Sequence, residues 1–319
     1  MTVKKRILIF GLGRMGLTHL SLLSAYIEEE TEFFVYEPNF VNRALFRPLK
    51  TYIKLTWVIS ESELACLGKF DLCMVCSPPT HHHNNVLMVR NRASTLFVEK
   101  PLLTPRAAII GGFEKVEIGY VLRHNPLVRY LSEQIEIRGL RKLEMCLRAN
   151  TILSANAGWR GDERKGGGVV NEFGCHLINL AVKLAGTDIT LAGVSKASIY
   201  SERAPDAAEL TLQRKHIEIS IDLNWSDPTV RKPKYQIDGE YADGEKFSTD
   251  LFEFIDVSEA GNSRRINNAS IGSSSRFYLR GFEFSEQIAN LLQGKNVTEA
   301  ALEDALKTDE LIAEVSAWT

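Results

Sequence analysis

Short apolar runs alternate with stretches of helical periodicity in the first third of the chain. The pattern predicts strands at residues 7–10, 33–36, 71–76, 95–98 and 116–121, and helices at residues 17–26, 61–67 and 82–92. Between residues 101 and 116 there is room for only a stub of helix. Strands that alternate with helices build a parallel sheet covered on both faces, so residues 1–122 are predicted to form a doubly wound α/β domain.

The second half of the chain has a different rhythm. Strand-like segments follow one another at residues 142–151, 189–200, 207–214, 216–224 and 234–241, several with the period-two alternation of a sheet with one solvated face. Helical patterns occupy residues 172–185, 276–292 and 298–318. Residues 123–319 are therefore predicted to form an α+β domain with a large, open, mostly antiparallel sheet. The segment 262–275 is rich in Ser, Asn, Gly and Arg, which predicts a mobile loop.

The first predicted strand runs into Gly11, Leu12, Gly13, Arg14, Met15 and Gly16, and a helix follows. Glycines at the first, third and sixth positions between a strand and a helix are typical of a loop that binds a dinucleotide pyrophosphate. Gly11 allows the tight turn, Gly13 lets backbone N–H groups approach the phosphates, and Gly16 lets helix and strand pack closely. These six residues are predicted to bind the cofactor, with the anion at the positive end of the helix.

Glu37 ends the second predicted strand, roughly 20 residues beyond the last glycine, where this fold places an acid on the adenosine ribose. A carboxylate accepts a hydrogen bond from the ribose 2′-hydroxyl but repels a 2′-phosphate, so Glu37 favours NAD(H) over NADP(H). Arg43 is the nearest cation after it. The competing interpretation is a tight strand-to-helix turn followed by a surface glutamate.

Composition narrows the class of protein. The 319 residues are 45% apolar, which suggests two domains, each with its own hydrophobic core. The formal net charge of −2 indicates no basic face that could bind nucleic acid. The longest apolar runs fall short of a membrane helix, and the first residues lead into a strand rather than resembling a signal peptide. The five cysteines have no metal-ligand spacing, so we expect reduced thiols in a cytoplasmic protein.

Several further segments, taken in order, resemble one family. Ser77-Pro78-Pro79-Thr80-His81 is similar to its loop after the fourth strand, and Glu99-Lys100-Pro101 to its hallmark tripeptide. Residues 119–126 resemble its domain junction, and Trp159-Arg160 followed by residues 166–176 its substrate-domain helix start. With the glycine loop, these motifs resemble the glucose-fructose oxidoreductase, inositol dehydrogenase and rhizopine-catabolism (Gfo/Idh/MocA) oxidoreductases over nearly the whole chain.

The resemblance implies an amino-terminal Rossmann domain and assigns roles to residues of both domains. Lys100 would stand near the nicotinamide and the reacting oxygen as acid or base, with His176 and Glu172 as its catalytic partners. The cofactor would also contact Ser77, Pro78, Thr80, His81, Glu99 and Lys100. The substrate would contact Lys100, Tyr120, Arg123, Asn125, Trp159, Arg160, Glu172 and His176. The competing interpretations are a surface cation at Lys100 and a structural histidine at His176.

Two departures from the family pattern fall on one predicted helix. Glu172 and His176 are four residues apart and so share a face, but Glu172 stands where an aspartate is usual. The extra methylene moves the carboxylate by about a bond length, which would shift the geometry or make Glu172 a substrate contact. Asn179 replaces a second frequent acid on the same helix, and the segment between residues 101 and 119 is shorter than is typical.

The consecutive histidines 81–83 are not predicted to bind a metal, because three neighbouring side chains cannot converge and no acid or cysteine cluster completes the shell. His81 is expected beside the nicotinamide end of the cofactor, by the family pattern, and the other two in solvent.

The favoured hypothesis is an NAD(H)-dependent oxidoreductase that acts on a ring alcohol or ketone of a sugar, cyclitol or nucleotide-linked sugar. Its expected partners are a small sugar-like substrate and further copies of the chain, as a homodimer or homotetramer through the carboxyl-terminal sheet; nucleic acid and membrane are not expected. One alternative is a reductase of C=N or C=C bonds in a small metabolite. The other is a non-catalytic nucleotide-binding sensor or scaffold.

Overall fold

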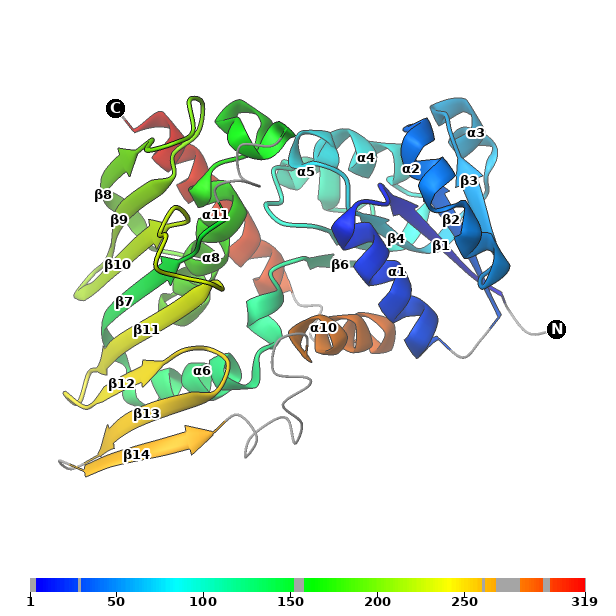
Figure 1. The fold of residues 1–319 in the computed structure, drawn as a ribbon. Coiled ribbons are helices and arrows are strands. Elements are labelled where there is room, and N and C mark those ends of the chain that lie inside the picture. The colour runs from blue at the N-terminus through cyan, green and yellow to red at the C-terminus, as the bar shows by residue number, and fades with distance from the viewer. Residues whose placement is uncertain are drawn as a thin grey trace. The chain divides into compact units, whose positions relative to one another are not determined.

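The computed structural model describes residues 4–27, 30–151, 158–259, 262–267, 282–294 and 299–318. The chain packs as two units (Figure 1). Residues up to Gly119 and Ile288–Leu302 form the first, and Tyr120–Gln287 and Glu303–Thr319 form the second. The sequence patterns predict domains at residues 1–122 and 123–319. The segment Ile288–Leu302 instead belongs to the first unit.

The first unit is built on a six-stranded parallel sheet in the order β3-β2-β1-β4-β5-β6. This is the strand order of a doubly wound Rossmann sheet, which confirms the predicted fold class. The strands are β1 (Lys5–Phe10), β2 (Thr31–Tyr36), β3 (Leu55–Val58), β4 (Phe70–Val75), β5 (Ala93–Val98) and β6 (Lys115–Ile118). The helices are α1 (Arg14–Tyr26), α2 (Phe40–Leu45), α3 (Glu61–Cys66), α4 (His82–Val89) and α5 (Arg106–Ile109).

Two elements of this unit escaped the sequence patterns. The strand β3 has only four residues, and its burial pattern shows no clean alternation. Helix α2 has no buried residue and begins at Asn39, whose side chain accepts hydrogen bonds from the N–H groups of Val41 and Asn42. Short elements with little buried surface leave no periodicity to detect.

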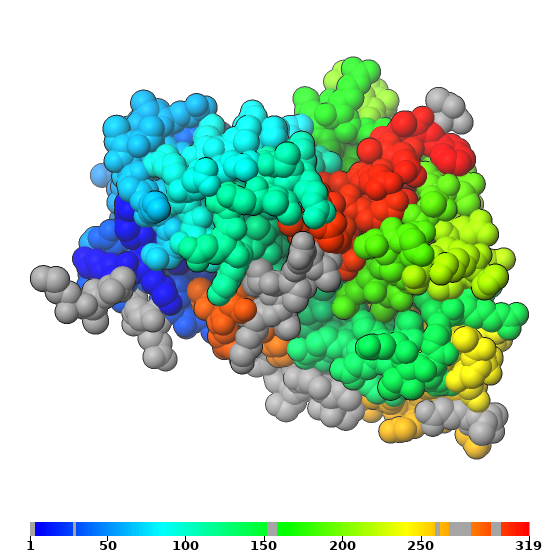
Figure 2. Space-filling view, turned by 180° about the vertical axis from the view of Figure 1, so that it is seen from behind, coloured from blue at the N-terminus to red at the C-terminus, as the bar shows by residue number. Residues whose placement is uncertain are grey.

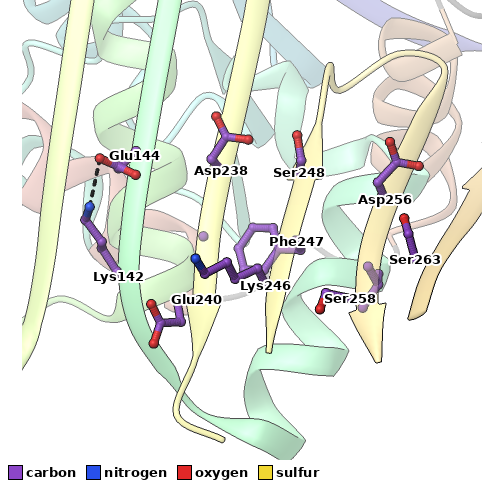
Figure 3. A pocket seen from close by; sticks show the side chains of 12 residues that line it. Lys142, Glu144, Asp238, Glu240, Lys246, Phe247, Ser248, Asp256, Ser258 and Ser263 are labelled. Carbon is purple, nitrogen blue, oxygen red and sulfur yellow. Dashed lines mark ion pairs between the residues drawn. The ribbon is translucent and has the colours of Figure 1, made fainter. Parts of the chain in front are cut away.

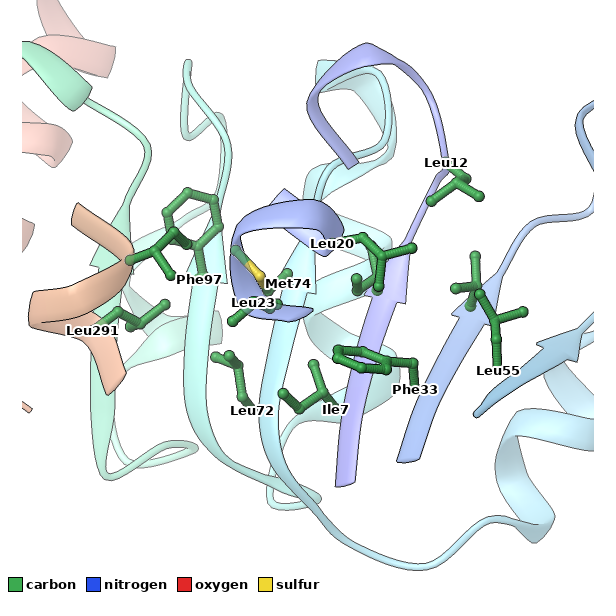
Figure 4. Packing of buried hydrophobic residues seen from close by; sticks show 13 residues of the cluster. Ile7, Leu12, Leu20, Leu23, Phe33, Leu55, Leu72, Met74, Phe97 and Leu291 are labelled. Atoms are coloured by element: carbon green, nitrogen blue, oxygen red, sulfur yellow. The ribbon is translucent and has the colours of Figure 1, made fainter. Parts of the chain in front are cut away.

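The core of the first unit lies on the α1 face of the sheet (Figure 4). Alternate residues of the central strands, such as Ile7 and Ile9 of β1, meet Leu20 and Leu23 of α1 there. Leu291 from α10 (Phe282–Gln293) joins the same cluster beside Phe97. Figure 2 shows the opposite side of the molecule, where the cyan to teal segment that includes α4 and α5 forms much of this unit's surface.

The second unit is built on an eight-stranded sheet in the order β14-β13-β12-β11-β7-β10-β9-β8. Only the β7–β10 pair is parallel among these strands, which confirms the predicted open, mostly antiparallel sheet. Its strands are β7 (Leu140–Arg148), β8 (Thr190–Ala197), β9 (Ala207–Arg214), β10 (Ile217–Asn224), β11 (Lys234–Tyr241), β12 (Lys246–Thr249), β13 (Phe254–Glu259) and β14 (Asn262–Asn267). The last three strands were not predicted.

The prediction of a mobile loop over residues 262–275 is wrong for its first part. Residues Asn262–Asn267 pair antiparallel with β13 as the edge strand β14, and Arg265 forms an ion pair with Asp256 of β13. A polar composition is what an exposed edge strand needs, and it hides the strand from a hydrophobicity pattern. The rest of the predicted loop lies outside the described residues.

One face of this sheet is covered by helices and the other is open. Figure 1 shows α6 (Pro126–Arg138), α8 (Cys175–Ala185) and α11 (Glu299–Ala317) along the covered face. Leu143, Met145 and Leu147 of β7 are buried against that side, whereas the intervening residues of the strand are at least partly exposed. The alternation of β7 therefore places polar side chains on the open face, as its sequence pattern predicted.

Candidate functional site

The glycine loop joins β1 to α1 in a conformation that requires two of its glycines. Gly11 has a φ of +83°, and a Cβ at Gly16 would lie 2.1 Å from the carbonyl oxygen of Gly11. Gly13 begins α1, and no atom of the described chain lies within 4 Å of where its Cβ would be. Arg14 beside it is exposed, and Met15 is half-buried. The start of α1 thus presents backbone N–H groups to open space, as an anion site needs.

Glu37 lies directly against this loop. Its carboxylate accepts hydrogen bonds from the N–H of Leu12 at 3.0 Å, the N–H of Asn39 at 3.0 Å and the side-chain amide of Asn42 at 3.2 Å. Arg43 does not pair with this carboxylate in the contacts seen here, because its guanidinium donates to the carbonyl oxygens of Glu37 and Pro38. The acid predicted to bind a ribose is therefore fixed beside the predicted pyrophosphate loop. Asn42 is a supporting residue that no motif revealed.

The loop after β4 lies beside the glycine loop. A Cβ on Gly11 would come within 3.1 Å of the Cα of Ser77. The hydroxyl of Ser77 accepts a hydrogen bond from the Asn85 side chain at 2.8 Å, while Pro78, Thr80 and His81 are exposed. The residues predicted to contact the cofactor from this loop therefore lie at one edge of the sheet with the glycine loop.

The expectation that His82 lies in solvent is wrong. Its side chain is 0% exposed, with Nδ1 2.9 Å from the carbonyl oxygen of Pro101 and Nε2 2.9 Å from that of Ser77. Burial lowers the pKa of His82, while the two carbonyl oxygens act in the opposite direction. The reason is its position as the first residue of α4, from which its ring contacts the loops that follow β4 and β5. His83 is half-buried and also departs from the expectation.

Glu99 and Lys100 follow β5, at the same edge of the sheet. The Glu99 carboxylate lies 2.7 Å from Nε2 of His19 on α1 and accepts a hydrogen bond from the N–H of Lys100 at 3.2 Å. Burial alone would raise the pKa of Glu99, but the His19 contact and the charge of Lys100 hold it below its usual value. Glu99 is 6% exposed, so in the structure it supports Lys100 from beneath. The Lys100–Pro101 peptide is cis.

In the second unit, Trp159 and Arg160 cross the glycine segment that precedes the helix. A Cβ on Gly167 would lie 2.2 Å from the carbonyl oxygen of Arg160, which accepts a hydrogen bond from the N–H of Gly168 at 2.9 Å. The Arg160 guanidinium lies 4.5 Å from the centre of the Trp159 ring, and its Nε donates to Glu172 at 3.3 Å. Glu172, which stands where the resemblance implies an aspartate, thus contacts the Arg160 guanidinium.

Glu172 and His176 lie where a turn of π-helix (Val170–Gly174) passes into α8. The ring of Tyr120 meets the His176 ring edge-on, with centroids 6.2 Å apart and an interplanar angle of 89°. Tyr120 is 2% exposed, and His176 is half-buried. The structure therefore brings Tyr120 to His176, and Arg160 to Glu172, within this unit. Single turns of π-helix of this kind are frequent at functional sites.

Arg123 has a partner that the sequence did not suggest. Its guanidinium donates to Asp304 of α11 at 2.8 Å and to the side-chain oxygen of Asn179 at 3.4 Å. The amide of Asn179 in turn donates to Thr308 at 3.0 Å. The acid missing from position 179 is thus matched by a carboxylate from α11, which lies 181 residues from Arg123 in sequence.

Asn125 has a structural environment rather than an open one. It is 0% exposed, its oxygen accepts from the N–H of Leu127 as the cap of α6, and its amide donates to Leu251 and to Glu283 at 2.8 Å. Because Asn125 is fully buried and its side chain is hydrogen-bonded within the protein, it has no accessible surface for a substrate. We therefore leave Asn125 out of the proposed substrate contacts.

A surface depression lies on the open face of the eight-stranded sheet, away from the predicted site residues of the second unit (Figure 3). Charged side chains such as Lys142, Glu144 and Asp238 line it, with Phe247 among them. None of the predicted site residues belongs to its lining. Its polar walls and open form fit a solvated sheet face better than an enclosed catalytic pocket.

The described segments contain neither a cluster of metal ligands nor a membrane-spanning helix. No group of three or more His, Cys, Asp or Glu side chains there is arranged to hold a metal ion. Among the helices of those segments, none combines the length and apolar character that crossing a bilayer requires.

Comparison with known proteins gives a sequence match to part of the chain and fold matches to nearly all of it. Residues 140–243 match the model of the GFO/IDH/MocA C-terminal domain. No curated protein matches the chain.

Solved structures with the same fold cover 99% of the chain. An oxidoreductase domain protein from Kribbella flavida is 17% identical, with a TM-score of 0.79 and 97% of its own chain covered. A levoglucosan dehydrogenase in complex with NADH and levoglucosan is 13% identical, with a TM-score of 0.77 and 98% covered. The WlbA dehydrogenase from Bordetella pertussis, in complex with NADH and UDP-GlcNAcA, is 16% identical, with a TM-score of 0.77 and 97% covered.

Proposed function

We propose that the chain is a GFO/IDH/MocA oxidoreductase and that it moves a hydride between a nicotinamide cofactor and a ring alcohol or ketone of a sugar, cyclitol or nucleotide-linked sugar. One observation carries the proposal: Glu37, the glycine loop and Lys100 lie at the carboxyl ends of strands of one parallel sheet, with Glu37 bound to the N–H of Leu12. That edge is where open α/β sheets bind their ligands.

The cradle in the first unit fits a dinucleotide. The open space at Gly13 suits a pyrophosphate on the N–H groups at the start of α1, and Glu37 suits a ribose hydroxyl. The carboxylate would repel a 2′-phosphate, and Arg43 is held by two carbonyl oxygens, so the cofactor proposed is NAD(H) rather than NADP(H). Ser77, Pro78, Thr80 and His81 would complete the contacts. No metal is part of the proposal.

Lys100 is the proposed acid and base. When bound, the nicotinamide supplies the carbon that accepts or donates the hydride. In alcohol oxidation Lys100 would take the hydroxyl proton at Nζ, and in ketone reduction it would return that proton to the oxygen. Glu99 is buried beneath it and bonded to its N–H, which orients the backbone from which the side chain leaves.

The second unit would contribute the substrate contacts and the other proton-transfer group. His176 is the proposed partner of Lys100 in acid–base catalysis, with its ring set by Tyr120. Glu172 would act through or beside His176, and Arg160, Trp159 and Arg123 would bind the substrate's polar groups. The Glu172–Arg160 contact supports a role for Glu172 at the substrate rather than at the reacting bond.

The test begins with titration of NADH and NADPH against the purified protein, followed by nicotinamide fluorescence. NADH should bind more tightly than NADPH. Lys100→Met should lower hydride transfer to a panel of sugars and nucleotide-linked sugars by about 100-fold or more, since it removes the proton-transfer group but leaves the other predicted cofactor contacts. Lys50→Met, at an exposed position of the same unit, is the matched control. A folded wild-type protein that fails to bind NADH would refute the proposal.

The same variant separates the alternatives. A reductase of C=N or C=C bonds should retain activity on its substrate when Lys100 is replaced by Met, because no alcohol proton has to move. A sensor or scaffold should bind NADH and transfer hydride to no member of the panel.

Oligomeric state and location are further parts of the proposal. The open face of the eight-stranded sheet carries paired charges such as Arg148–Asp222 and Lys142–Glu144, and we propose that it joins copies of the chain as a dimer or tetramer. Light scattering that finds a monomer at micromolar concentration would contradict this. None of the five cysteines forms a disulfide, which supports a cytoplasmic location.

A further inference from the structure

Two fully buried histidines hold the residues on either side of Lys100. His19, on α1, lies 2.7 Å from the carboxylate of Glu99, and His82, on α4, lies 2.9 Å from the carbonyl oxygen of Pro101. We propose that His19 and His82 are positioning residues that set the orientation of Lys100. The inference rests on the role proposed for Lys100, but its test does not depend on catalysis.

His82 ties two loops together. Its two ring nitrogens face the carbonyl oxygens of Ser77, after β4, and Pro101, after β5. A neutral imidazole has one N–H and donates to one of these oxygens at a time, whereas the imidazolium donates to both. Either form supplies a buried carbonyl oxygen with a donor that water does not reach. Removing the ring nitrogens would free the loop on the Lys100 side from the loop on the Ser77 side.

His19 gives the Glu99 carboxylate one orientation. One carboxylate oxygen meets His19, and the other accepts the hydrogen bond from the N–H of Lys100. A Cβ on Gly119 would lie 2.9 Å from that second oxygen, so the adjacent chain leaves space for this rotamer only because residue 119 is glycine. The His19 ring packs edge-on against Phe97 of β5, with centroids 4.8 Å apart.

The arrangement links the cofactor cradle to the proposed catalytic group. The helix α1 follows the glycine loop and carries His19, which contacts Glu99. Glu99 in turn accepts the hydrogen bond from the N–H of Lys100. The position of the Lys100 backbone is therefore tied to the helix that would meet the pyrophosphate. A purely structural role would make the two histidines matter for stability alone. A positioning role adds a specific expectation, which is that Lys100 changes its environment when either ring loses its nitrogens.

The experiment replaces each histidine by a ring without nitrogen and by an amide. His19→Phe and His82→Phe remove the donors, whereas His19→Gln and His82→Gln return an N–H donor. At fixed pH, the acetylation rate of Lys100 relative to that of Lys142 is measured by mass spectrometry. His216→Phe, at an exposed position in the second unit, is the control. We expect altered Lys100 acetylation in the Phe variants, restoration towards the wild-type rate in the Gln variants, and no change in the control.

A kinetic split completes the test where hydride transfer is found. The Phe variants should lower kcat by about 10-fold to 100-fold, as expected for a small misplacement of a catalytic group, with little change in the affinity for NADH. Folded Phe variants with wild-type Lys100 acetylation would overturn the inference and leave the proposed function intact. Failure of the wild-type protein to bind NADH would overturn the proposed function instead.

A measurement on the wild-type protein covers the case in which the Phe variants do not fold. The N–H of Lys100 donates to Glu99, so its exchange with deuterium should be slowed by about tenfold or more relative to an unprotected amide. Exchange at the unprotected rate would show that Glu99 does not hold the Lys100 backbone, and would overturn the inference without any substitution.

Discussion

The two units stabilise their functional polar groups in different ways. In the first unit, Glu37 and Glu99 are buried at strand ends, and their hydrogen bonds come from neighbouring backbone N–H groups and from the side chains of Asn42 and His19. In the second unit, Glu172 and Arg123 lie on or against α8 and meet the opposite charges of Arg160 and Asp304. The first arrangement follows from the topology of a parallel sheet, and the second depends on which helices happen to face each other.

This difference explains why the positions of the site residues in the first unit could be predicted from the sequence. All strands of a parallel sheet end at one edge in the same sense, so motifs that follow β1, β2, β4 and β5 must meet there. A helix face carries no such rule. The partner of Arg123 comes from α11, and only packing brings that helix to α8.

The largest expected effect tests whether the glycine loop is built for backbone packing or for a ligand. Gly16→Ala places a Cβ 2.1 Å from the carbonyl oxygen of Gly11 and should destabilise the first unit by about 3 kcal/mol, measured by denaturant unfolding. Gly13→Ala meets no described atom within 4 Å, so its stability should be unchanged while its NADH affinity falls about tenfold. Equal effects of the two substitutions on stability would contradict the distinct roles assigned to these glycines.

A smaller effect tests the charge pairing of the second unit. Asp304→Asn leaves Arg123, whose side chain is 14% exposed, without its carboxylate and beside Lys183. The pKa of Lys183 is already lowered by burial and by Arg123, so the loss of Asp304 should cost about 2 kcal/mol of unfolding free energy.

Glu310→Gln is the matched control on the same helix, because Glu310 pairs with Lys307 at a 57% exposed position. It should change the unfolding free energy by less than about 0.5 kcal/mol. If both substitutions cost the same, the contrast between the buried Arg123–Asp304 pair and the surface Lys307–Glu310 pair is not real.

The smallest effect concerns Glu283, the buried carboxyl group that meets Asn125. Burial raises its pKa above the unfolded value, so its protonated form is favoured in the folded chain. Its contribution to stability is therefore full at pH below the unfolded pKa and is lost as pH rises through the folded pKa.

Glu283→Gln keeps an oxygen for the Asn125 amide and removes the charge. The variant should gain in Tm relative to the wild type above about pH 7 and show little difference near pH 4. An equal difference at both pH values would show that the charge of Glu283 does not contribute. A pH-dependent difference would sharpen the comparison between units, because the His19 contact and the charge of Lys100 hold the pKa of Glu99 below its usual value, whereas burial raises the pKa of Glu283.

Local patterns were sufficient for five of the six strands of the first sheet, for the glycine loop and for the tripeptide at Lys100, because each depends on residues adjacent in sequence. They also indicated the mostly antiparallel second sheet, since period-two alternation reports which face of a strand is solvated. The same patterns missed α6, β3 and the polar edge strand β14. They placed His82 in solvent, because a histidine run carries no hydrophobic signal even when one member is buried between two loops.

The sequence by itself determined that residues 11–16, Glu37 and Lys100 lie at one edge of a sheet, since motifs that follow strands of a parallel sheet meet at the same edge. Only the tertiary structure decided that His19 meets Glu99 across 80 residues, that Asp304 meets Arg123 across 181, and that Ile288–Leu302 packs with the first unit. Such pairings depend on which buried donors and acceptors face each other after the helices pack. That choice is made by the whole core and leaves no mark on any short stretch of the chain.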